Sequence, residues 1–321
     1  MISIKKNLIN KKDKIFLAGH NGLVGSAVLK KLREHGYTRI ILADRKKLDL
    51  LNQEKVFKFI KKNKPKAVII CAAKVGGVKA NNNNKFDFLY ENLQIQNNLI
   101  YSSHINNIKK LIFLGSSCIY PADSKQPIKE NYILSGPLEK TNDAYAIAKI
   151  AGVKMCQALN EKYKRNYLCL MPPNIFGIND NFDLQNSHFI PALIRKICVA
   201  IKKKQKYIEV WGSGKPKREL MYDEDLAEAI IYFLNLKTEE SLINVGSNFE
   251  KTINQFTKIL IKISKSKLQI KNIIKEPDGV KRKIVDCTIA KKYGWKSKYN
   301  VPKYLRIVFD HYKKNYQALR N

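Results

Sequence analysis

IFLAGHNGLVG, residues 15–25, joins an apolar strand to a glycine-rich turn near the amino terminus. Residues 15–18 have the composition of a buried strand, and residues 26–35 have the pattern of an amphipathic helix. The turn between them contains three glycines, Gly19, Gly22 and Gly25. Because glycine has no Cβ, these positions let a diphosphate approach the backbone amides at the positive end of the helix. The G-x-x-G-x-x-G spacing, in this strand, turn and helix, predicts a dinucleotide-binding site.

Four further apolar runs of strand length follow the glycine turn, at residues 40–43, 67–71, 111–114 and 167–170. Helical patterns lie between them. This alternation predicts an α/β fold with a doubly wound, parallel, Rossmann-like sheet. Ligands of such sheets lie beyond the carboxyl ends of the strands, so functional residues are expected just after each apolar run.

Tyr145 and Lys149 stand four residues apart on a predicted helix, where positions i and i+4 share a face. A phenol titrates near pH ~10 in water, and a neighbouring ammonium favours the phenolate. We therefore expect Lys149 to lower the pKa of Tyr145, which prepares the phenol for proton exchange with a ketone or alcohol oxygen. Ser116 and Cys118 follow the strand at 111–114, on the ligand side of the sheet. Tyr-x-x-x-Lys also occurs on solvated helix faces, so only its combination with the glycine turn favours an active site.

The residue after the second strand usually separates the two nicotinamide cofactors, and here two neighbours point in opposite directions. Asp44 is suited to accept a hydrogen bond from a ribose 2′-hydroxyl, which favours NAD. Arg45 is suited to pair with a 2′-phosphate, which favours NADP. The residues alone leave both cofactors open.

The composition of the chain limits the partners and sites that it can have. The 321-residue chain carries 60 Lys and Arg against 27 Asp and Glu, a formal net charge of +33. The excess is mostly lysine spread from end to end without a nucleic-acid-binding motif, so we expect no specific nucleic-acid partner. No apolar run approaches the ~20 residues of a membrane helix and no secretory signal opens the chain, which predicts a cytoplasmic protein without a membrane partner. Its cysteines lack C-x-x-C spacing, so no disulfide and no metal site are expected.

The second half of the chain is predicted to add a smaller α/β substrate-binding lobe. Helices are expected at 187–203, 223–235 and 252–264, and strands at 208–211 and 242–245. We predict that residues 1–171 plus 220–245 form the dinucleotide-binding domain, and that residues 172–219 plus 246–321 form the lobe. Residues 1–14 are interpreted as a charged leader.

Several strings resemble those of the GDP-L-fucose synthases, a family of extended short-chain dehydrogenases/reductases. The similarity runs from about Lys14 to the carboxyl end. The most specific strings are GHNGLVGS at 19–26, AAKVGG at 72–77, LGSSCIYP at 114–121, YAIAKIAG at 145–152, NSH at 186–188 and WGSG at 211–214.

The resemblance implies a substrate and a reaction. The protein would convert GDP-4-keto-6-deoxy-D-mannose to GDP-L-fucose with NADPH, by epimerisation at C3 and C5 and reduction at C4. Cys118 would act as base and His188 as acid at C3 and C5. Tyr145, assisted by Ser116 and Lys149, would hold and protonate the C4 oxygen. Another nucleotide-sugar 4-reductase or 4-epimerase of the same fold is the alternative, although those reactions need no acid and base at C3 and C5.

The family pattern also assigns binding residues. The cofactor would contact Gly19, His20, Asn21, Gly22, Leu23, Val24, Gly25, Asp44, Arg45, Ala72, Ala73, Leu114, Lys149, Pro172, Asn174, Ile175 and His188. The GDP-sugar would contact Lys196, Trp211, Arg218 and Asp278. A homodimer through the helices near 86–107 and 143–163 is implied as well.

The sequence departs from the family at a few of these positions. Asn21 stands where the family often has an arginine that helps to bind the NADP phosphate, which with Asp44 weakens the NADPH assignment. Arg45 and Lys46 still favour NADPH, with NAD as the second choice. Pro173 and Phe176 replace the usual Thr and Tyr.

Overall fold

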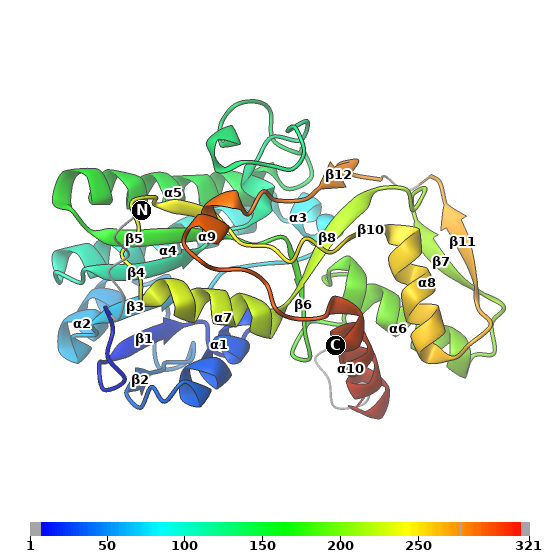
Figure 1. Ribbon diagram of the computed structural model, residues 1–321, viewed down its shortest axis with the longest axis horizontal. Coiled ribbons are helices and arrows are strands. Elements are labelled where there is room, and N and C mark those ends of the chain that lie inside the picture. The colour runs from blue at the N-terminus through cyan, green and yellow to red at the C-terminus, as the bar shows by residue number, and fades with distance from the viewer. Residues whose placement is uncertain (1–7, 276–277, 316–321) are drawn as a thin grey trace.

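The structure is a computed structural model that describes residues 8–275 and 278–315. It has a larger half built on one parallel sheet and a smaller half that carries α6, α8 and α10 (Figure 1). The bounds of these three helices are Phe189–Lys202, Ile253–Ser264 and Val301–Asn315. The larger half contains the glycine turn, and the smaller half contains most of the residues predicted to bind the sugar nucleotide.

Six parallel strands form the central sheet in the order β2-β1-β3-β4-β5-β9. Their bounds are β1 Ile15–Ala18, β2 Ile40–Ile41, β3 Ala67–Ile70, β4 Lys110–Leu114, β5 Asn166–Met171 and β9 Leu242–Asn244. The chain leaves β1 toward β2 on one side and returns to β3 on the other. A ligand crevice opens at such a reversal, beyond the carboxyl ends of β1 and β3. The predicted doubly wound α/β fold is confirmed.

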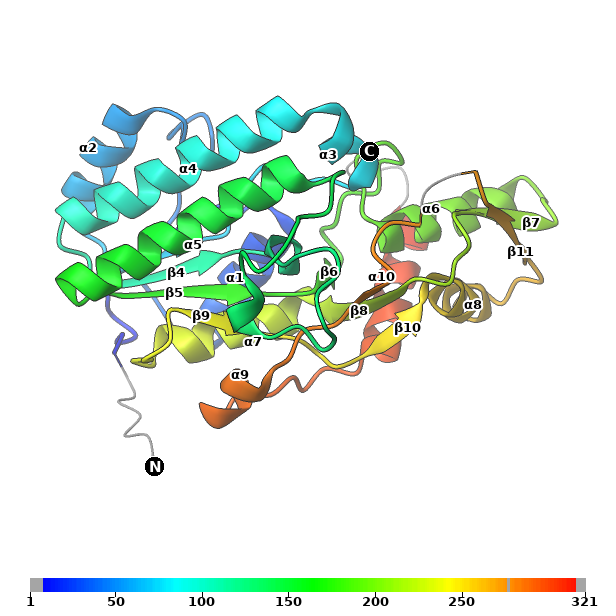
Figure 2. The same cartoon turned by 90° about the horizontal axis from the view of Figure 1, so that it is seen from above.

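Helices cover both faces of this sheet (Figure 2). α2, α4 and α5 lie on one face, with bounds Gln53–Asn63, Lys85–Ile105 and Asp143–Tyr163. α1 and α7 lie on the other, with bounds Leu23–Glu34 and Asp223–Leu234. Successive strand residues enter opposite cores, because Ile15 and Leu17 pack toward α1 and α7 whereas Phe16 and Ala18 pack toward α2 and α4. A strand buried on both faces explains the unbroken apolar runs.

Short strands build the smaller half. β8 pairs with three strands, β6, β10 and β12, while β7 pairs with β11. Their bounds are β6 Asn174–Phe176, β7 Tyr207–Trp211, β8 Lys217–Tyr222, β10 Glu250–Thr252, β11 Gln269–Ile273 and β12 Arg282–Lys283. A third core between α6, α8 and α10 buries aromatic and aliphatic side chains, among them Phe182, Phe256 and Phe309. The remaining short helices are α3 Val78–Asn83, α9 Thr288–Lys292 and the 3-10 turns Ser117–Ile119 and Glu130–Tyr132.

The structure differs from the sequence-based expectations in three places. The first helix begins at Leu23 rather than Ser26, directly after Gly22. The predicted leader is partly wrong, because Ile9 is buried in the core and the Leu8 amide donates to the Asn235 carbonyl; residues 1–7 lie outside the described residues. Residues 285–295, assigned to the smaller lobe, pack several side chains into the core beside the large sheet.

Candidate active site

The glycine turn fits a diphosphate. Gly19 has φ +87°, a left-handed backbone that favours glycine, and it lies against the backbone of Ala72 after β3. A Cβ built on Gly25 would stand 1.9 Å from the carbonyl oxygen of Gly19. Only glycine allows the turn and α1 to approach so closely. His20 adds a buried Nδ1 that has no hydrogen-bond partner among the described residues. These features form a cradle for an anionic group at the start of α1.

Most of the other residues predicted at the cofactor lie on the segments that follow β1, β3 and β5. Leu23 opens α1, Val24 packs against the core beneath it, and Ala72 and Ala73 follow β3. Beyond β5, the carbonyl of Pro172 accepts from the Ser117 amide at 3.0 Å. Asn174 and Ile175 lie on β6, where the Asn174 amide donates to the Glu219 carbonyl at 3.3 Å. These residues therefore follow the carboxyl ends of β1, β3 and β5, where ligands of such sheets lie.

Asp44 has a local partner. Its Oδ1 accepts a 2.8 Å hydrogen bond from the backbone amide of Lys47, which closes a turn after β2. Arg45, Lys46 and Lys47 stand exposed on the same turn. One carboxylate oxygen of Asp44 is thus engaged in holding the turn, and three basic residues follow it in the same turn. This arrangement favours a 2′-phosphate over a bare 2′-hydroxyl.

Tyr145 and Lys149 share one face of α5. Lys149 is buried, its Nζ donates to the Leu114 carbonyl at 2.8 Å, and it lies 5.8 Å from the centre of the Tyr145 ring. Burial raises the pKa of Tyr145, with the nearby Cys118 adding to the effect, and it lowers the pKa of Lys149 to about 8. The predicted lowering of the Tyr145 pKa is therefore wrong for this structure. In water the attraction between the two groups would favour the phenolate, but the loss of water on burial outweighs that attraction.

Ser116 and Cys118 stand on a tight turn past the end of β4. Ser116 is extended, and its Oγ accepts from the Cys118 amide at 3.2 Å at the start of a 3-10 turn. Ser117 points inward and is buried. The hydroxyl hydrogen of Ser116 is free for an external acceptor, since the hydrogen bond to Cys118 uses only an oxygen lone pair.

Cys118 has two side-chain neighbours that the sequence did not single out. Asn142 Nδ2 lies 3.4 Å from the sulfur, and Lys283 Nζ lies 3.8 Å from it. Asn142 directly precedes α5, and Lys283 ends β12. The segment that holds Lys283 lies 165 residues away in sequence, so no local pattern points to it.

His188 is the residue directly before α6. The loop before it packs on the loop after β3, where the Gly77 amide donates to the Asn186 carbonyl at 2.8 Å. A Cβ on Gly77 would stand 2.3 Å from the carbonyl oxygen of Ser187. Burial lowers the pKa of His188. The two glycine-containing loops thus fix the start of α6 and the histidine on it.

The residues predicted to bind the sugar nucleotide are held by neighbours in the smaller half. Lys196 Nζ lies 5.0 Å from the Trp211 ring centre and donates to the Glu209 carbonyl. Arg218 donates to the carbonyl of Val280 at 2.6 Å, and burial lowers its pKa. Asp278 accepts from the backbone and hydroxyl of Ser213.

Arg218 interacts with Cys118 and with another residue predicted to bind the sugar nucleotide. Electrostatic contacts join Arg218 to both Cys118 and Asp278. Trp211 and Lys196 form a separate pair on β7 and α6.

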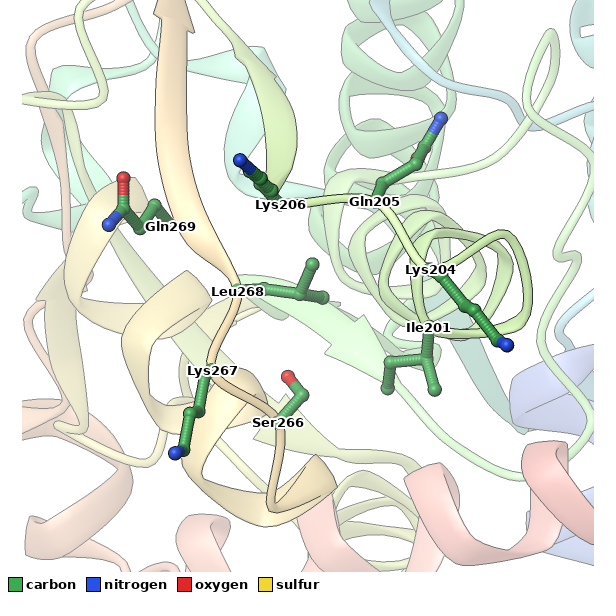
Figure 3. Close-up of a pocket in the computed structure, with 8 residues that line it drawn as sticks. All are labelled: Ile201, Lys204, Gln205, Lys206, Ser266, Lys267, Leu268 and Gln269. Atoms are coloured by element: carbon green, nitrogen blue, oxygen red, sulfur yellow. The ribbon is translucent and has the colours of Figure 1, made fainter.

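A separate recess of about 410 Å³ lies at the other end of α6 from His188 (Figure 3). Its walls are Ile201, Lys204, Gln205, Lys206, Ser266, Lys267, Leu268 and Gln269. α6 has 14 residues and is about 21 Å long, so the recess is about that far from His188. The recess contains none of the predicted site residues.

Two other findings limit the kinds of site. In the described ranges, no group of three or more His, Cys, Asp or Glu side chains is placed to hold a metal ion. None of the helices in those ranges is long and apolar enough to cross a bilayer.

Comparison with known proteins agrees with this geometry. The sequence matches the family described as NAD dependent epimerase/dehydratase over residues 15–246. It is 45% identical to a GDP-L-fucose synthase of Sinorhizobium fredii over 285 residues, 89% of this chain and 90% of that protein. A GDP-6-OMe-4-keto-L-xylo-heptose reductase of Campylobacter jejuni superposes with a TM-score of 0.89 at 32% identity, covering 96% of this chain and 99% of the other. A GDP-L-fucose synthetase of Naegleria fowleri bound to NADP gives 0.90 at 25% identity, covering 99% and 97%.

Proposed function

This chain belongs to the NAD dependent epimerase/dehydratase family, and from that premise we propose that it is a GDP-L-fucose synthase. It converts GDP-4-keto-6-deoxy-D-mannose to GDP-L-fucose by inverting C3 and C5 and then reducing C4. The observation that carries the proposal is the placement of Cys118 beside Tyr145 and Ser116 at the end of β4, since simple 4-reduction needs no thiol there. NADP is the cofactor, as in the Naegleria fowleri neighbour, and the tied carboxylate of Asp44 supports that choice.

Inversion uses the acidity of hydrogens beside a ketone. Cys118, as thiolate, removes the proton at C3 or C5, and the electrons of the broken C–H bond pass into an enolate at the C4 oxygen. His188, as imidazolium, delivers a proton to the opposite face and so inverts the carbon. The thiol and the neutral imidazole then exchange protons with water, which resets both groups. Burial lowers the pKa of His188 in the protein alone, and the anionic diphosphate favours its charged form on binding.

Reduction uses a different set of residues. The bound cofactor supplies a hydride to C4. Tyr145 gives its phenolic proton to the C4 oxygen as the alkoxide forms, and the raised pKa keeps the phenol protonated for that step. Ser116 donates a hydrogen bond to the same oxygen. Lys149, held on the Leu114 carbonyl, adds a positive charge next to the phenol.

The remaining residues hold the substrate. Arg218 has the planar fork that suits diphosphate oxygens, and Lys196 offers a point charge beside the Trp211 ring. Asp278 shapes the turn at Ser213 that faces the sugar nucleotide. The six free cysteines fit a reducing compartment, which supports a cytoplasmic location.

A homodimer is also part of the proposal. Apolar side chains stand exposed on the outer faces of α4 and α5: Phe86, Tyr90, Tyr101, Ile105, Ile147 and Tyr163. The two helices lie side by side over the sheet (Figure 2). Two copies of this helix pair would cover the apolar surface in a symmetric interface.

The test is a product assay in D₂O with GDP-4-keto-6-deoxy-D-mannose and either NADPH or NADH. We expect GDP-L-fucose with deuterium at C3 and C5, formed faster with NADPH. Cys118→Ser should lose both deuterium labels while hydride transfer to the unepimerised ketone persists. Cys198→Ser, at a half-buried thiol on α6, is the matched control and should behave like the parent protein.

The assay also separates the second candidate function. The Campylobacter jejuni heptose reductase favours a simple 4-reductase. That activity would give a 4-reduced product without deuterium at C3 and C5, in the parent protein as well as in the Cys118 variant. Deuterium retained in Cys118→Ser would instead refute Cys118 as the base.

A further inference from the structure

Two donors from separate elements approach the sulfur of Cys118. Asn142 Nδ2 approaches the sulfur at 3.4 Å from the start of α5, and Lys283 Nζ approaches at 3.8 Å from the end of β12. Neither residue belongs to the strand end that carries the cysteine. Two separate elements have therefore been brought to one sulfur atom.

The charged surroundings of the sulfur favour a negative charge on it. Lys283 and Arg218 stand on the paired strands β12 and β8, where Lys283 is directly opposite Arg218 in the register. Arg218 has an electrostatic contact with Cys118. Tyr145 on α5 also interacts electrostatically with Cys118, and its raised pKa keeps it neutral at physiological pH. The acidic groups Asp278 and Glu139 act on Arg218 and so offset part of its effect.

The oxygen of the Asn142 side-chain amide also suggests that this residue interacts with Cys118 in both of its protonation states. Its Oδ1 is buried and has no hydrogen-bond partner among the described residues. The same amide can therefore donate to a thiolate through Nδ2 or accept from a thiol through Oδ1 after a rotation of the side chain. A group that serves both protonation states suits an atom that gains and loses a proton in every turnover.

We propose that Lys283 and Asn142 are positioning residues that hold Cys118 as a thiolate and aim it at the substrate carbon. The ammonium of Lys283 stabilises the negative charge of the thiolate, and the hydrogen bond from Asn142 orients the sulfur. The proposal rests on the role of Cys118 as a base in the proposed function, and it adds two residues that act through the cysteine. A positive charge next to a thiol raises the thiolate fraction at neutral pH.

Alkylation of Cys118 by iodoacetamide measures this fraction without substrate or cofactor. The thiolate displaces iodide, so the rate follows the thiolate population, and mass spectrometry of the Cys118 peptide separates it from the other cysteines. Burial raises the pKa of Cys71 to about 12 and of Cys198 to about 11, which keeps these two slow. We expect Lys283→Met to slow alkylation at pH 7 about tenfold and to move the pH–rate curve to higher pH.

Matched variants separate charge from packing. Lys283→Arg keeps the charge and should restore the parent curve, whereas Lys281→Met removes an exposed charge two residues away and should leave it unchanged. Asn142→Ala should shift the midpoint less than Lys283→Met while lowering deuterium exchange at C3 and C5 more than hydride transfer. If Lys283→Met does not fold, as judged by circular dichroism, Lys283→Gln takes its place in the same comparison.

The outcomes discriminate between this proposal and the proposed function. Coincident alkylation curves for Lys283→Met and the parent protein would overturn the role of Lys283. A higher KM for the GDP-sugar without a shifted curve would do the same and make Lys283 a substrate ligand. A shifted curve in a protein that converts no GDP-4-keto sugar would uphold the thiolate assignment and reject the proposed function.

Discussion

The ammonium of Lys149 donates to the carbonyl oxygen of Leu114 across 2.8 Å, and this bond ties α5 to the end of β4. Tyr145 stands one turn earlier on α5, and Ser116 stands two residues beyond Leu114. The bond therefore fixes the spacing between the phenol and the serine. A charged donor makes the stronger hydrogen bond, so this bond weakens when the buried Lys149 loses its proton.

Reduction is expected to slow above pH 8. Burial lowers the pKa of Lys149 to about 8, so the group is charged below that pH and neutral above it. The charge supports the developing alkoxide, and its loss removes that support. The rate of NADPH oxidation should fall with a midpoint near pH 8. Lys149→Arg, which stays charged, should lose this midpoint even if its rate is lower, and an unchanged midpoint in the arginine variant would contradict the assignment.

Gly77→Ala should displace His188 and slow the proton transfer proposed for it. The added Cβ would lie 2.3 Å from the Ser187 carbonyl oxygen, so the loop before α6 must move. We expect deuterium exchange at C3 and C5 to fall at least about tenfold, because proton transfer depends on placement within a fraction of an ångström. Gly136→Ala is the control, since its Cβ would meet only Pro121 at ordinary contact distance. Equal exchange rates in both variants would remove the loop contact as a determinant of His188.

The free energy of unfolding should depend on pH through the buried Lys110. This lysine is buried at the start of β4, and burial lowers its pKa from 10.5 to about 7. Between those values the unfolded chain holds a proton that the folded chain releases, so this group makes the free energy of unfolding rise with pH. The contribution is at most about 1.4 kcal/mol per pH unit.

Lys110→Met removes that contribution. Urea unfolding at pH 7.5, 8.5 and 9.5 should therefore show the parent protein gaining stability relative to the variant as the pH rises. Lys109→Met, at the exposed neighbouring position, should stay parallel to the parent protein. Parallel curves for Lys110→Met as well would mean that the buried lysine stays charged throughout.

Tyr101→Asp should convert the proposed dimer to a monomer. Tyr101 is 46% exposed on the outer face of α4, where a dimer through α4 and α5 would bury it. Ile274→Asp is the matched control, because Ile274 is 70% exposed in the smaller half, away from these helices. Light scattering after size-exclusion chromatography measures both masses. A Tyr101→Asp protein that stays dimeric would place the interface elsewhere.

The sequence predicts the sheet, the glycine turn and the candidate residues on them, because each depends on neighbours within a few residues. It cannot reveal Lys283, since the lysine reaches Cys118 only through the pairing of β12 with β8. Strands such as β6, β10 and β12 have two or three residues and carry almost no periodic signal. The Tyr145 pKa was predicted in the wrong direction because burial of a side chain cannot be read from its sequence neighbours.

The pairing of Lys283 with Arg218 on adjacent strands also has an evolutionary consequence. One short ribbon carries the arginine proposed to grip the diphosphate and the lysine proposed to balance the thiolate. A lineage that remodels this ribbon to accept another nucleotide thereby disturbs the stereochemistry of the sugar. The residues proposed for hydride transfer, on α5 and past the end of β4, lie outside the ribbon, so they can be inherited unchanged while the handedness of the product changes.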